Sequence, residues 1–356
     1  MAINLPNPLL FDRVFTTFQQ ETGPSGASDT FDYQAGAGNV SMGGGNDIVV
    51  FRQYVATLDL GNGNDTAFLF NGAGTVTGGR GNDKVFSEGF INSVDMGSGN
   101  DMVRLYDFAG ANTIDLGRGH DVLRTEGGYV NEVDAGRGVD AILLGDGGAG
   151  TVDLGGGRLD LLLSDGYVIN VNGGNGTDIV GLFDGGGTAN LGRGNDFLFA
   201  DDWVENANGQ QGNDVIALFG GGRANGGAGN DIIAIDDRTV YADGGNGNDR
   251  IALAFDKDEW DFIDGGNGRD GLFVVVENES ERQSLLAELE AEFGGPSGSG
   301  FGGPRGVDPP DGYVAALNAN ITNIEYVRVV TTSEAYQEAA SFVDPRATMD
   351  EYSEIA

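Results

Sequence analysis

Apolar and polar residues alternate in short stretches that return about every eighteen residues over most of the chain. Each stretch follows an aspartate that closes a glycine-rich run. The second residue after this motif aspartate is Val49, Ala67, Val85, Val103, Leu123, Ile142, Leu162, Val180, Leu198, Ile216, Ile233, Ile251 or Leu272. The fourth is Phe51, Leu69, Leu105, Leu144, Leu182, Leu218, Ile235, Leu253 or Val274, with smaller residues in the other four repeats. A period of two predicts a strand with one buried face.

Each repeat contains a second stretch in which apolar and polar residues alternate in the same way. Its apolar side holds the pairs Leu58 and Leu60, Val94 and Met96, Ile114 and Leu116, and Ile169 and Val171. The pattern of each repeat therefore predicts a strand, a turn, a second strand and a second turn. One such coil buries too few side chains to be stable alone. We predict an all-β fold, a parallel β-solenoid (β-roll) of about 13 coils with two strands per coil of about 18 residues and short helical or strand caps.

The turn before each first strand is a glycine-rich run such as Gly61-Asn62-Gly63-Asn64-Asp65. Glycine adopts backbone angles closed to other residues, so alternating glycines let a tight turn direct several carbonyl oxygens at one point. A carboxylate follows at once, and calcium prefers carbonyl and carboxylate oxygens. Because the coils stack, each ion could be held by two successive turns. The aspartates that close these runs are Asp47, Asp65, Asp83, Asp101, Asp121, Asp140, Asp160, Asp178, Asp196, Asp214, Asp231, Asp249 and Asp270.

Three runs match a known motif most closely: Gly78-Gly79-Arg80-Gly81-Asn82-Asp83, Gly226-Gly227-Ala228-Gly229-Asn230-Asp231 and Gly244-Gly245-Asn246-Gly247-Asn248-Asp249. From about Asn39 to Val276 the sequence resembles the repeats-in-toxin (RTX, haemolysin-type calcium-binding) family, whose G-G-x-G-x-D-x-U-x repeat forms a calcium-binding parallel β-helix. The resemblance implies multiple Ca2+ ions held by the thirteen aspartates and by turn glycines. The glycines carried over are Gly61, Gly63, Gly79, Gly81, Gly97, Gly99, Gly117, Gly119, Gly192, Gly194, Gly227, Gly229, Gly245, Gly247, Gly266 and Gly268.

The sequence departs from the family pattern, because alternate nonapeptides have lost the motif. Turns such as Asp146-Gly147-Gly148-Ala149-Gly150 keep glycine but lack the closing Asn-Asp. We therefore expect calcium along one edge of the roll only, with at most about twelve ions between thirteen turns. His120 and Val139 replace the motif asparagine, and the run before Asp160 has an extra residue. Whether the sites at Asp140 and Asp160 hold calcium stays open at this point.

Composition supports a metal-dependent repeat domain. Gly-Asn-Asp runs also form turns without metal, but carboxylates stacked a few ångströms apart repel each other unless a cation lies between them. The chain has 356 residues, 64 glycines, no cysteine and a net charge of −36. This acidity argues against nucleic acid or membrane insertion as a mode of action. Without metal, the same repulsion keeps such a chain disordered, so we expect calcium binding and folding to be coupled.

The flanking segments predict caps and an export signal. We assign residues 1–38 to an N-terminal cap, 39–276 to the RTX roll, 277–293 to an amphipathic helix, 294–312 to a Gly/Pro linker and 313–356 to a C-terminal strand cap. Phe11, Val14, Phe15 and Phe18 have helical spacing and predict a capping helix, or alternatively a partner-binding segment. Two strands are expected around Asn318-Ala319-Asn320. The resemblance implies type I secretion through the C-terminal tail, without an N-terminal signal peptide, to the outside or the cell surface.

The outward strand faces suggest partners. Ile48, Val50, Phe68, Phe70, Leu161, Leu163, Phe197 and Phe199 make the outward side of the first strands apolar. Such a stripe is larger than soluble monomers usually expose, so we expect it to be covered by the chain's own helix and tail or by a second copy. The outward side of the second strands carries a column of threonine and aspartate. This column is typical of a solvated face, with ice binding as the alternative.

No catalytic constellation is visible in the sequence. His120 is the only histidine and lies in a repeat turn, there is no H-E-x-x-H motif, and no Ser-His or Cys-His pair is plausible. We expect the protein not to be an enzyme, a carboxylate glycosidase or lyase on the solenoid face being the alternative. The favoured function is structural, in a surface layer, matrix, filament or adhesin that self-assembles. The second hypothesis is a recognition module for glycans or ice.

Overall fold

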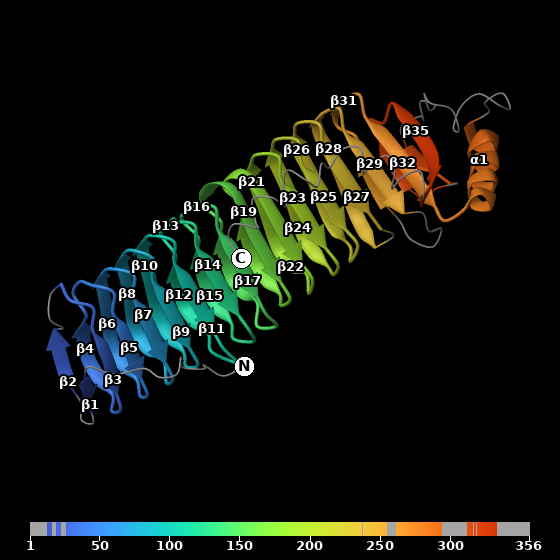
Figure 1. The fold of residues 1–356 in the computed structure, drawn as a ribbon. Coiled ribbons are helices and arrows are strands. Elements are labelled where there is room, and N and C mark those ends of the chain that lie inside the picture. The colour runs from blue at the N-terminus through green and yellow to red at the C-terminus, as the bar shows by residue number, and fades with distance from the viewer. Residues whose placement is uncertain are drawn as a thin grey trace. The chain divides into compact units, whose positions relative to one another are not determined.

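The computed structural model describes residues 13–15, 19–22, 26–236, 238–254, 261–293, 312–315, 317 and 319–332. Contacts between residues divide the chain into two units, Met1–Gly192 and Arg193–Ala356. Each unit is a parallel β-solenoid in which every coil supplies one strand to each of two stacked columns, and the labelled strands of each unit lie side by side in Figure 1. The predicted fold class is confirmed.

In the first unit, each strand pairs in parallel with the strand one coil away. The first column holds β1 (Arg13–Phe15), β3 (Thr30–Tyr33), β5 (Ile48–Phe51), β7 (Thr66–Leu69), β9 (Lys84–Ser87), β11 (Met102–Leu105), β14 (Val122–Thr125), β17 (Ala141–Leu144), β19 (Gly156–Ser164) and β21 (Asn175–Leu182). The second holds β2 (Gln19–Thr22), β4 (Ala37–Ser41), β6 (Val55–Asn62), β8 (Ala73–Arg80), β10 (Ile91–Ser98), β12 (Ala111–Asp115), β15 (Val130–Asp134), β18 (Ala149–Asp153), β20 (Val168–Asn172) and β22 (Gly186–Arg193). Two short strands, β13 (Arg118–Gly119) and β16 (Arg137–Gly138), lie in turns.

The second unit repeats this arrangement. Its first column holds β23 (Phe197–Ala200), β25 (Val215–Leu218), β27 (Ile232–Ile235), β29 (Arg250–Ala254), β32 (Gly271–Val276) and β35 (Tyr326–Thr331). Its second holds β24 (Val204–Gln211), β26 (Gly222–Ala228), β28 (Thr239–Gly247), β30 (Asp261–Asp264) and β34 (Ala319–Thr322), with β31 (Asn267–Gly268) in a turn. The final element pair departs from the parallel pattern, because β33 (Gly312–Val314) pairs antiparallel with β34.

The core lies between the two columns of each unit. All thirteen apolar residues predicted to point inward from the first strands, from Val49 to Leu272, are fully buried. The residues two positions further on are also buried, including the small Ser87 and Thr125. Ser87 is satisfied there, since its hydroxyl donates to the carbonyl of Gly89 at 2.7 Å. The period of two therefore identified the buried face of every first strand.

One prediction for the second strands is wrong. Ile169 was paired with Val171 on the buried side, but Ile169 is 48% exposed and Val168 is buried in its place. Other second strands show the same pattern. In β6, Val55, Leu58 and Leu60 point inward, and two outward residues separate Val55 from Leu58. The register between β18 and β20 is constant, but Gly150 and Ile169 are not among the paired residues, and two successive outward residues, Ile169 and Asn170, break the alternation at the start of β20.

The caps differ from the prediction. Arg13–Phe15 forms the strand β1 in parallel pairing with β3, so the helix predicted over Phe11 to Phe18 is wrong at Val14 and Phe15, while Phe11 and Phe18 lie outside the described residues. At the other end, Ala319 and Asn320 lie within β34, which pairs with β30, and do not form a turn between two strands. The coils therefore extend beyond residues 39–276 on both sides, because β3 pairs with β5 and β35 with β32.

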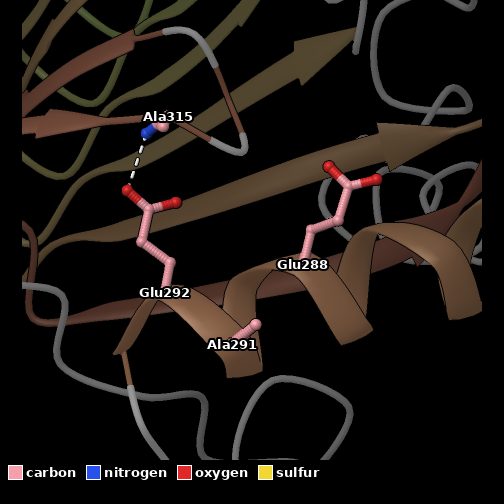
Figure 2. A pocket seen from close by; sticks show the side chains of 4 residues that line it. All are labelled: Glu288, Ala291, Glu292 and Ala315. Atoms are coloured by element: carbon pink, nitrogen blue, oxygen red, sulfur yellow. Dashed lines mark hydrogen bonds between the residues drawn. The ribbon is translucent and has the colours of Figure 1, made fainter.

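The one helix among the described residues, α1 (Glu279–Phe293), packs at the end of the second unit against β32 and β35. Leu285 and Leu289 are its buried side chains. Glu292 accepts a hydrogen bond from the Ala315 backbone N–H at 2.7 Å, and Figure 2 shows Glu288 on the same side of the helix. Among the described residues, no helix has the length and apolarity needed to span a membrane. The predicted linker and most of the predicted C-terminal tail lie outside the described residues.

The apolar outward side of the first strands is partly buried. Val50, Phe68 and Tyr106 form a buried cluster in the first unit, with Ile48, Phe70 and Phe86 packed against it. The rings of Phe68 and Phe86 stack at 5.2 Å, and the Arg104 guanidinium lies 4.5 Å from the centre of the Tyr106 ring. In the second unit, Phe197 and Phe199 are half-buried. Self-association through this face stays a prediction.

Candidate metal centre

The glycines of the motif turns adopt the conformation that only glycine tolerates well. The sixteen glycines named above as calcium ligands have φ between +85° and +158°. They also approach the neighbouring coil closely. A Cβ added to Gly63 would lie 1.7 Å from the Gly45 carbonyl oxygen, and one added to Gly81 would lie 1.8 Å from that of Gly63. Each turn therefore rests directly on the carbonyl groups of the turn before it.

The motif aspartates form a hydrogen-bonded ladder in each unit. The Asp65 carboxylate accepts the Asp47 backbone N–H through Oδ1 at 2.6 Å, and Asp83 accepts that of Asp65 at 2.8 Å. The ladder continues through Asp101, Asp121, Asp140 and Asp160 at 2.7 to 2.8 Å, and Asp178 pairs in register with Asp160. In the second unit it joins Asp196, Asp214, Asp231, Asp249 and Asp270 at 2.7 to 2.8 Å.

In eleven of the thirteen motif aspartates, the second carboxylate oxygen is buried and has no hydrogen-bond donor. The thirteen motif aspartates are at most 2% exposed. The Oδ2 atom lies inside the turn, against the first glycine of the motif, since a Cβ on Gly226 would fall 2.5 Å from Oδ2 of Asp231. The residues whose Oδ2 has no donor are Asp47, Asp65, Asp83, Asp101, Asp121, Asp140, Asp160, Asp214, Asp231, Asp249 and Asp270. A buried charged oxygen left in this state is strongly unfavourable unless a cation compensates it.

The electrostatics of the ladder show the same deficit of positive charge. Burial raises the pKa of Asp65, Asp101, Asp121 and Asp231 to about 7, against the opposing effect of the backbone N–H that each accepts. Burial raises the pKa of Asp140 to about 8 and those of Asp160, Asp214 and Asp270 to about 6. Neighbouring carboxylates add to the shift at Asp65, Asp101 and Asp140. Without a cation, the ladder therefore holds its protons to a higher pH than ordinary aspartates do.

A second ladder runs beside the first and was not anticipated. The Asn64 side chain accepts the Asn82 backbone N–H at 2.8 Å, and Asn82 accepts that of Asn100 at 2.9 Å. His120 takes the place of asparagine, since its Nδ1 accepts the Val139 N–H at 2.9 Å. This bond assigns the neutral imidazole with its proton on Nε2. The replacement that marked His120 as a weak motif in the sequence therefore preserves the hydrogen-bonding pattern.

Two ladder members at the ends were missed by sequence reasoning. The Asp29 backbone N–H donates to Asp47 at 2.7 Å, and Ser28 accepts the Asn46 N–H at 2.9 Å, so Ser28-Asp29 occupies the place of Asn-Asp. At the other end, the Asp270 backbone N–H donates to the Glu325 carboxylate. The spacing of the buried apolar residues could have identified these two end coils. Phe31 and Tyr33 follow Asp29, and Val327 and Val329 follow Glu325, with the spacing of every other coil.

A search of solved structures finds a hyperactive, Ca2+-dependent, β-helical antifreeze protein from an Antarctic bacterium, with a TM-score of 0.48 and 18% sequence identity over 90% of this chain and 92% of that chain. No protein-family model matches the chain, and no curated protein matches it.

The donor set of the turns fits a hard divalent cation. In the described part of the chain, no group of three or more His, Asp or Glu side chains is placed to hold a metal, so an ion would need carbonyl oxygens beside the aspartates. The turns can supply these, because a Cβ added to Gly209, Gly226 or Gly244 would lie close both to Oδ2 of a motif aspartate and to the carbonyl oxygen of a glycine one coil away. Calcium accepts many oxygen ligands in flexible geometry. Asp140 and Asp160 keep their places in the ladder, although the register shifts at the extra residue before Asp160.

Proposed function

We propose that the protein is a calcium-binding β-roll of the RTX type that needs calcium to fold. The observation that carries this proposal is the column of buried carboxylate oxygens without hydrogen-bond donors. Oδ2 of the motif aspartates and the carbonyl oxygens of the turn glycines would hold the ions. Calcium supplies the positive charge that the buried ladder lacks.

The chain's own residues prepare the site for this charge. The backbone N–H groups hold Oδ1 of each carboxylate, which fixes the orientation of Oδ2 within its turn. Glycine at positions such as Gly63 and Gly81 lets successive turns approach closely enough to share carbonyl groups. Because each site needs two stacked turns, the sites form only as coils stack, which couples binding to folding.

An extracellular structural role follows from the same chemistry. Turn sites built largely from carbonyl oxygens and one carboxylate per coil have modest affinity and fill where calcium is abundant, as it is outside cells. The net charge of −36 keeps the metal-free chain soluble and extended for export. We therefore propose secretion, with folding after export, and a role as a component of a surface layer, matrix, filament or adhesin.

Replacing one ladder aspartate is expected to weaken calcium binding. Asp101→Asn keeps an oxygen for the Asp83 N–H but removes the charge on the buried Oδ2. Isothermal titration of the chelator-treated protein with CaCl2 should show fewer ions bound and a higher calcium concentration for half-saturation. Asp95→Asn is the matched control, because Asp95 is exposed on the outward side of β10. Equal titrations for all three proteins, or no calcium uptake by the parent chain, would contradict the proposal.

The structural role predicts assembly that depends on calcium. The apolar outward strands, with Phe197 and Phe199 only half-buried, offer a surface for a second copy. Sedimentation velocity at increasing protein concentration should show species larger than a monomer in calcium and none in chelator. Phe199→Ser should lower the assembled fraction, whereas Ile169→Ser, on the other column and equally apolar, should leave it unchanged. A calcium-loaded monomer at all concentrations would rule out this role.

Ice binding receives less support from the same structure. The outward column of the second strands holds Thr57, Thr75, Thr113 and Thr151, but Ser93 and Glu132 interrupt it in paired register. Aspartates such as Asp95 and Asp115 stand on the same side two residues further along. A charged and interrupted column is typical of a solvated sheet face.

A further inference from the structure

A row of exposed aromatic side chains lies in the first unit at the turns that lead from a first-column strand to a second-column strand. The motif turns lie at the other edge, between a second-column strand and the next first-column strand. Each member of the row immediately precedes a strand of the second column: β6, β10, β15 or β20. The residues of this aromatic row are Tyr54, Phe90, Tyr129 and Tyr167, at 49%, 53%, 45% and 45% exposure. They are 36, 39 and 38 residues apart. The row therefore recurs every second coil, while the calcium motif recurs in every coil.

The register of the strands fixes this alternation. The first residues of successive second strands pair as Val55 with Ala73, Ala73 with Ile91, Ile91 with Ala111, and so on to Val168. The residues before them are aromatic in one coil and glycine in the next, as at Gly72, Gly110 and Gly148. In the second unit, Trp203 precedes β24 and Gly221 precedes β26, so the alternation occurs there too.

The tyrosine rings lie along the surface of the neighbouring coil. The Tyr54 hydroxyl would be 2.9 Å from a Cβ added to Gly74, and the Tyr129 hydroxyl would be 2.8 Å from one added to Gly150. Gly74 and Gly150 lie in β8 and β18, one coil further along the stack. Glycine therefore provides the flat floor over which each tyrosine extends. About half of each tyrosine remains exposed to solvent.

A turn requirement does not explain the row. Gly72 and Gly148 have φ of +74° and +64°, which favours glycine, whereas none of the four aromatic residues of the row has a positive φ. The backbone therefore explains glycine in alternate coils, but it does not require an aromatic side chain in the others. The rings are not core residues, because about half of each is exposed. Single exposed aromatics need no explanation, but an ordered series of them on one edge marks an interaction surface. Its regular spacing points to a ligand that is itself a linear repeat.

We propose that the aromatic row binds an extended, neutral, β-1,4-linked polysaccharide. Two strand spacings of about 4.8 Å place successive rings about 9.6 Å apart. In an extended β-1,4-linked glycan, every second sugar presents the same face, so its disaccharide repeat matches this spacing. The C–H face of a pyranose is apolar and stacks on an aromatic ring, while its hydroxyl groups remain at the edges for hydrogen bonds. Each ring of the row would hold one sugar of every disaccharide.

The surroundings of the row suit a neutral polymer. Asn92, Asn112 and Asn131 are exposed on the same edge, two residues after the row position of their coils, and the Asn112 amide donates to Asn92 at 2.8 Å. Carboxamides of this kind hydrogen-bond sugar hydroxyls. Acidic residues also precede the aromatics, as Glu88 precedes Phe90 and Asp165 precedes Tyr167. With a net charge of −36, this surface repels polyanionic glycans and accepts uncharged ones.

The test is retention of the calcium-loaded full chain on microcrystalline cellulose and on chitin, with granular starch as the α-linked comparison. Depletion isotherms should show binding to a β-1,4-linked matrix and little binding to starch. Tyr129→Ala should weaken that binding about tenfold, and Tyr129→Ala combined with Tyr167→Ala should abolish it. Phe262→Ala is the matched control, since Phe262 is 49% exposed but lies within β30 and not at the position before a strand that the row occupies. It should bind like the parent protein.

Circular dichroism in the presence of calcium distinguishes a failure of the glycan proposal from a failure of the proposal that calcium is needed for folding, on which it rests. A chain that gains sheet in calcium but is retained by neither cellulose nor chitin overturns the glycan proposal and leaves the calcium proposal standing. Equal retention on starch, or equal loss for the Phe262 and Tyr129 variants, also overturns it, because neither spacing nor the row would then matter.

Discussion

Removing calcium at about pH 8 is expected to unfold the protein, whereas at about pH 5 much of the sheet should persist without metal. The ordinary aspartate pKa is 3.8, and burial raises those of Asp101, Asp121 and Asp140 to about 7 or 8 in the folded chain. A carboxyl whose pKa is raised by folding stabilises the folded state fully below its unfolded pKa. This contribution is lost as the pH rises through the folded value. The metal-free protein should therefore lose stability between about pH 4 and pH 8.

Calcium reverses this dependence, because it binds the ionised form of the same carboxylates. Far-ultraviolet circular dichroism and sedimentation velocity in EGTA, at a series of pH values, would measure the effect. Matched samples with excess CaCl2 should be folded at pH 8 and should lose their advantage as the pH falls. Magnesium is the control cation, since it requires a tighter octahedral site and should restore little structure. A metal-free chain that is as rich in sheet at pH 8 as in calcium would contradict the prediction.

The second large effect is expected from one methyl group in a motif turn. Gly99 has φ of +146°, and a Cβ there would lie 1.7 Å from the Gly81 carbonyl oxygen. That contact is with backbone, so relief requires a shift of one coil against the next. The strain of the left-handed conformation and the collision together should make Gly99→Ala destabilise the calcium-bound protein by about 3 kcal/mol or more. Chemical denaturation in saturating calcium would measure this loss.

Gly156→Ala is the matched control for this substitution. Gly156 also lies at a motif turn, but an added Cβ would meet only the Asn175 side chain, at 4.0 Å. Its backbone angle is not in the left-handed region, because it is absent from the glycines with positive φ. This variant should change stability by less than about 1 kcal/mol. If both substitutions had the same small effect, the close stacking of the motif turns would be wrong.

Sequence reasoning identified the fold because the buried positions repeat without exception. Each first strand places its second and fourth residues after the aspartate in the core, so Val49 and Phe51 already describe the pattern that Leu272 and Val274 complete. Stacked coils have nearly the same environment, so a misleading residue in one coil does not change the pattern that the other coils share. The aspartate ladder was accessible for the same reason, although its Oδ1 hydrogen bonds and unpaired Oδ2 atoms were visible only in the structure.

The ends and irregular positions could not be predicted in this way. Val14 and Phe15 have helical spacing, yet pairing with β3 covers the open edge of the first coil, and this tertiary contact outweighs a local preference. Ile169 is apolar but lies at the irregular start of its strand, where simple alternation fails. Ser28 and Glu325 perform the roles of asparagine and aspartate with different side chains. A motif search requires identity, whereas the backbone requires only an acceptor.

The alternation of aromatic residue and glycine has a consequence for how such a chain can change its length during evolution. Deleting or duplicating one eighteen-residue segment would leave the acidic ladder continuous, because every coil presents an equivalent carboxylate. The same event would place two aromatics, or two glycines, in adjacent coils and put Tyr129 out of phase with Phe90. Only an even number of segments can be gained or lost without a break in phase. A pair of coils is therefore the smallest segment whose gain or loss keeps both the acidic ladder and the aromatic row in phase.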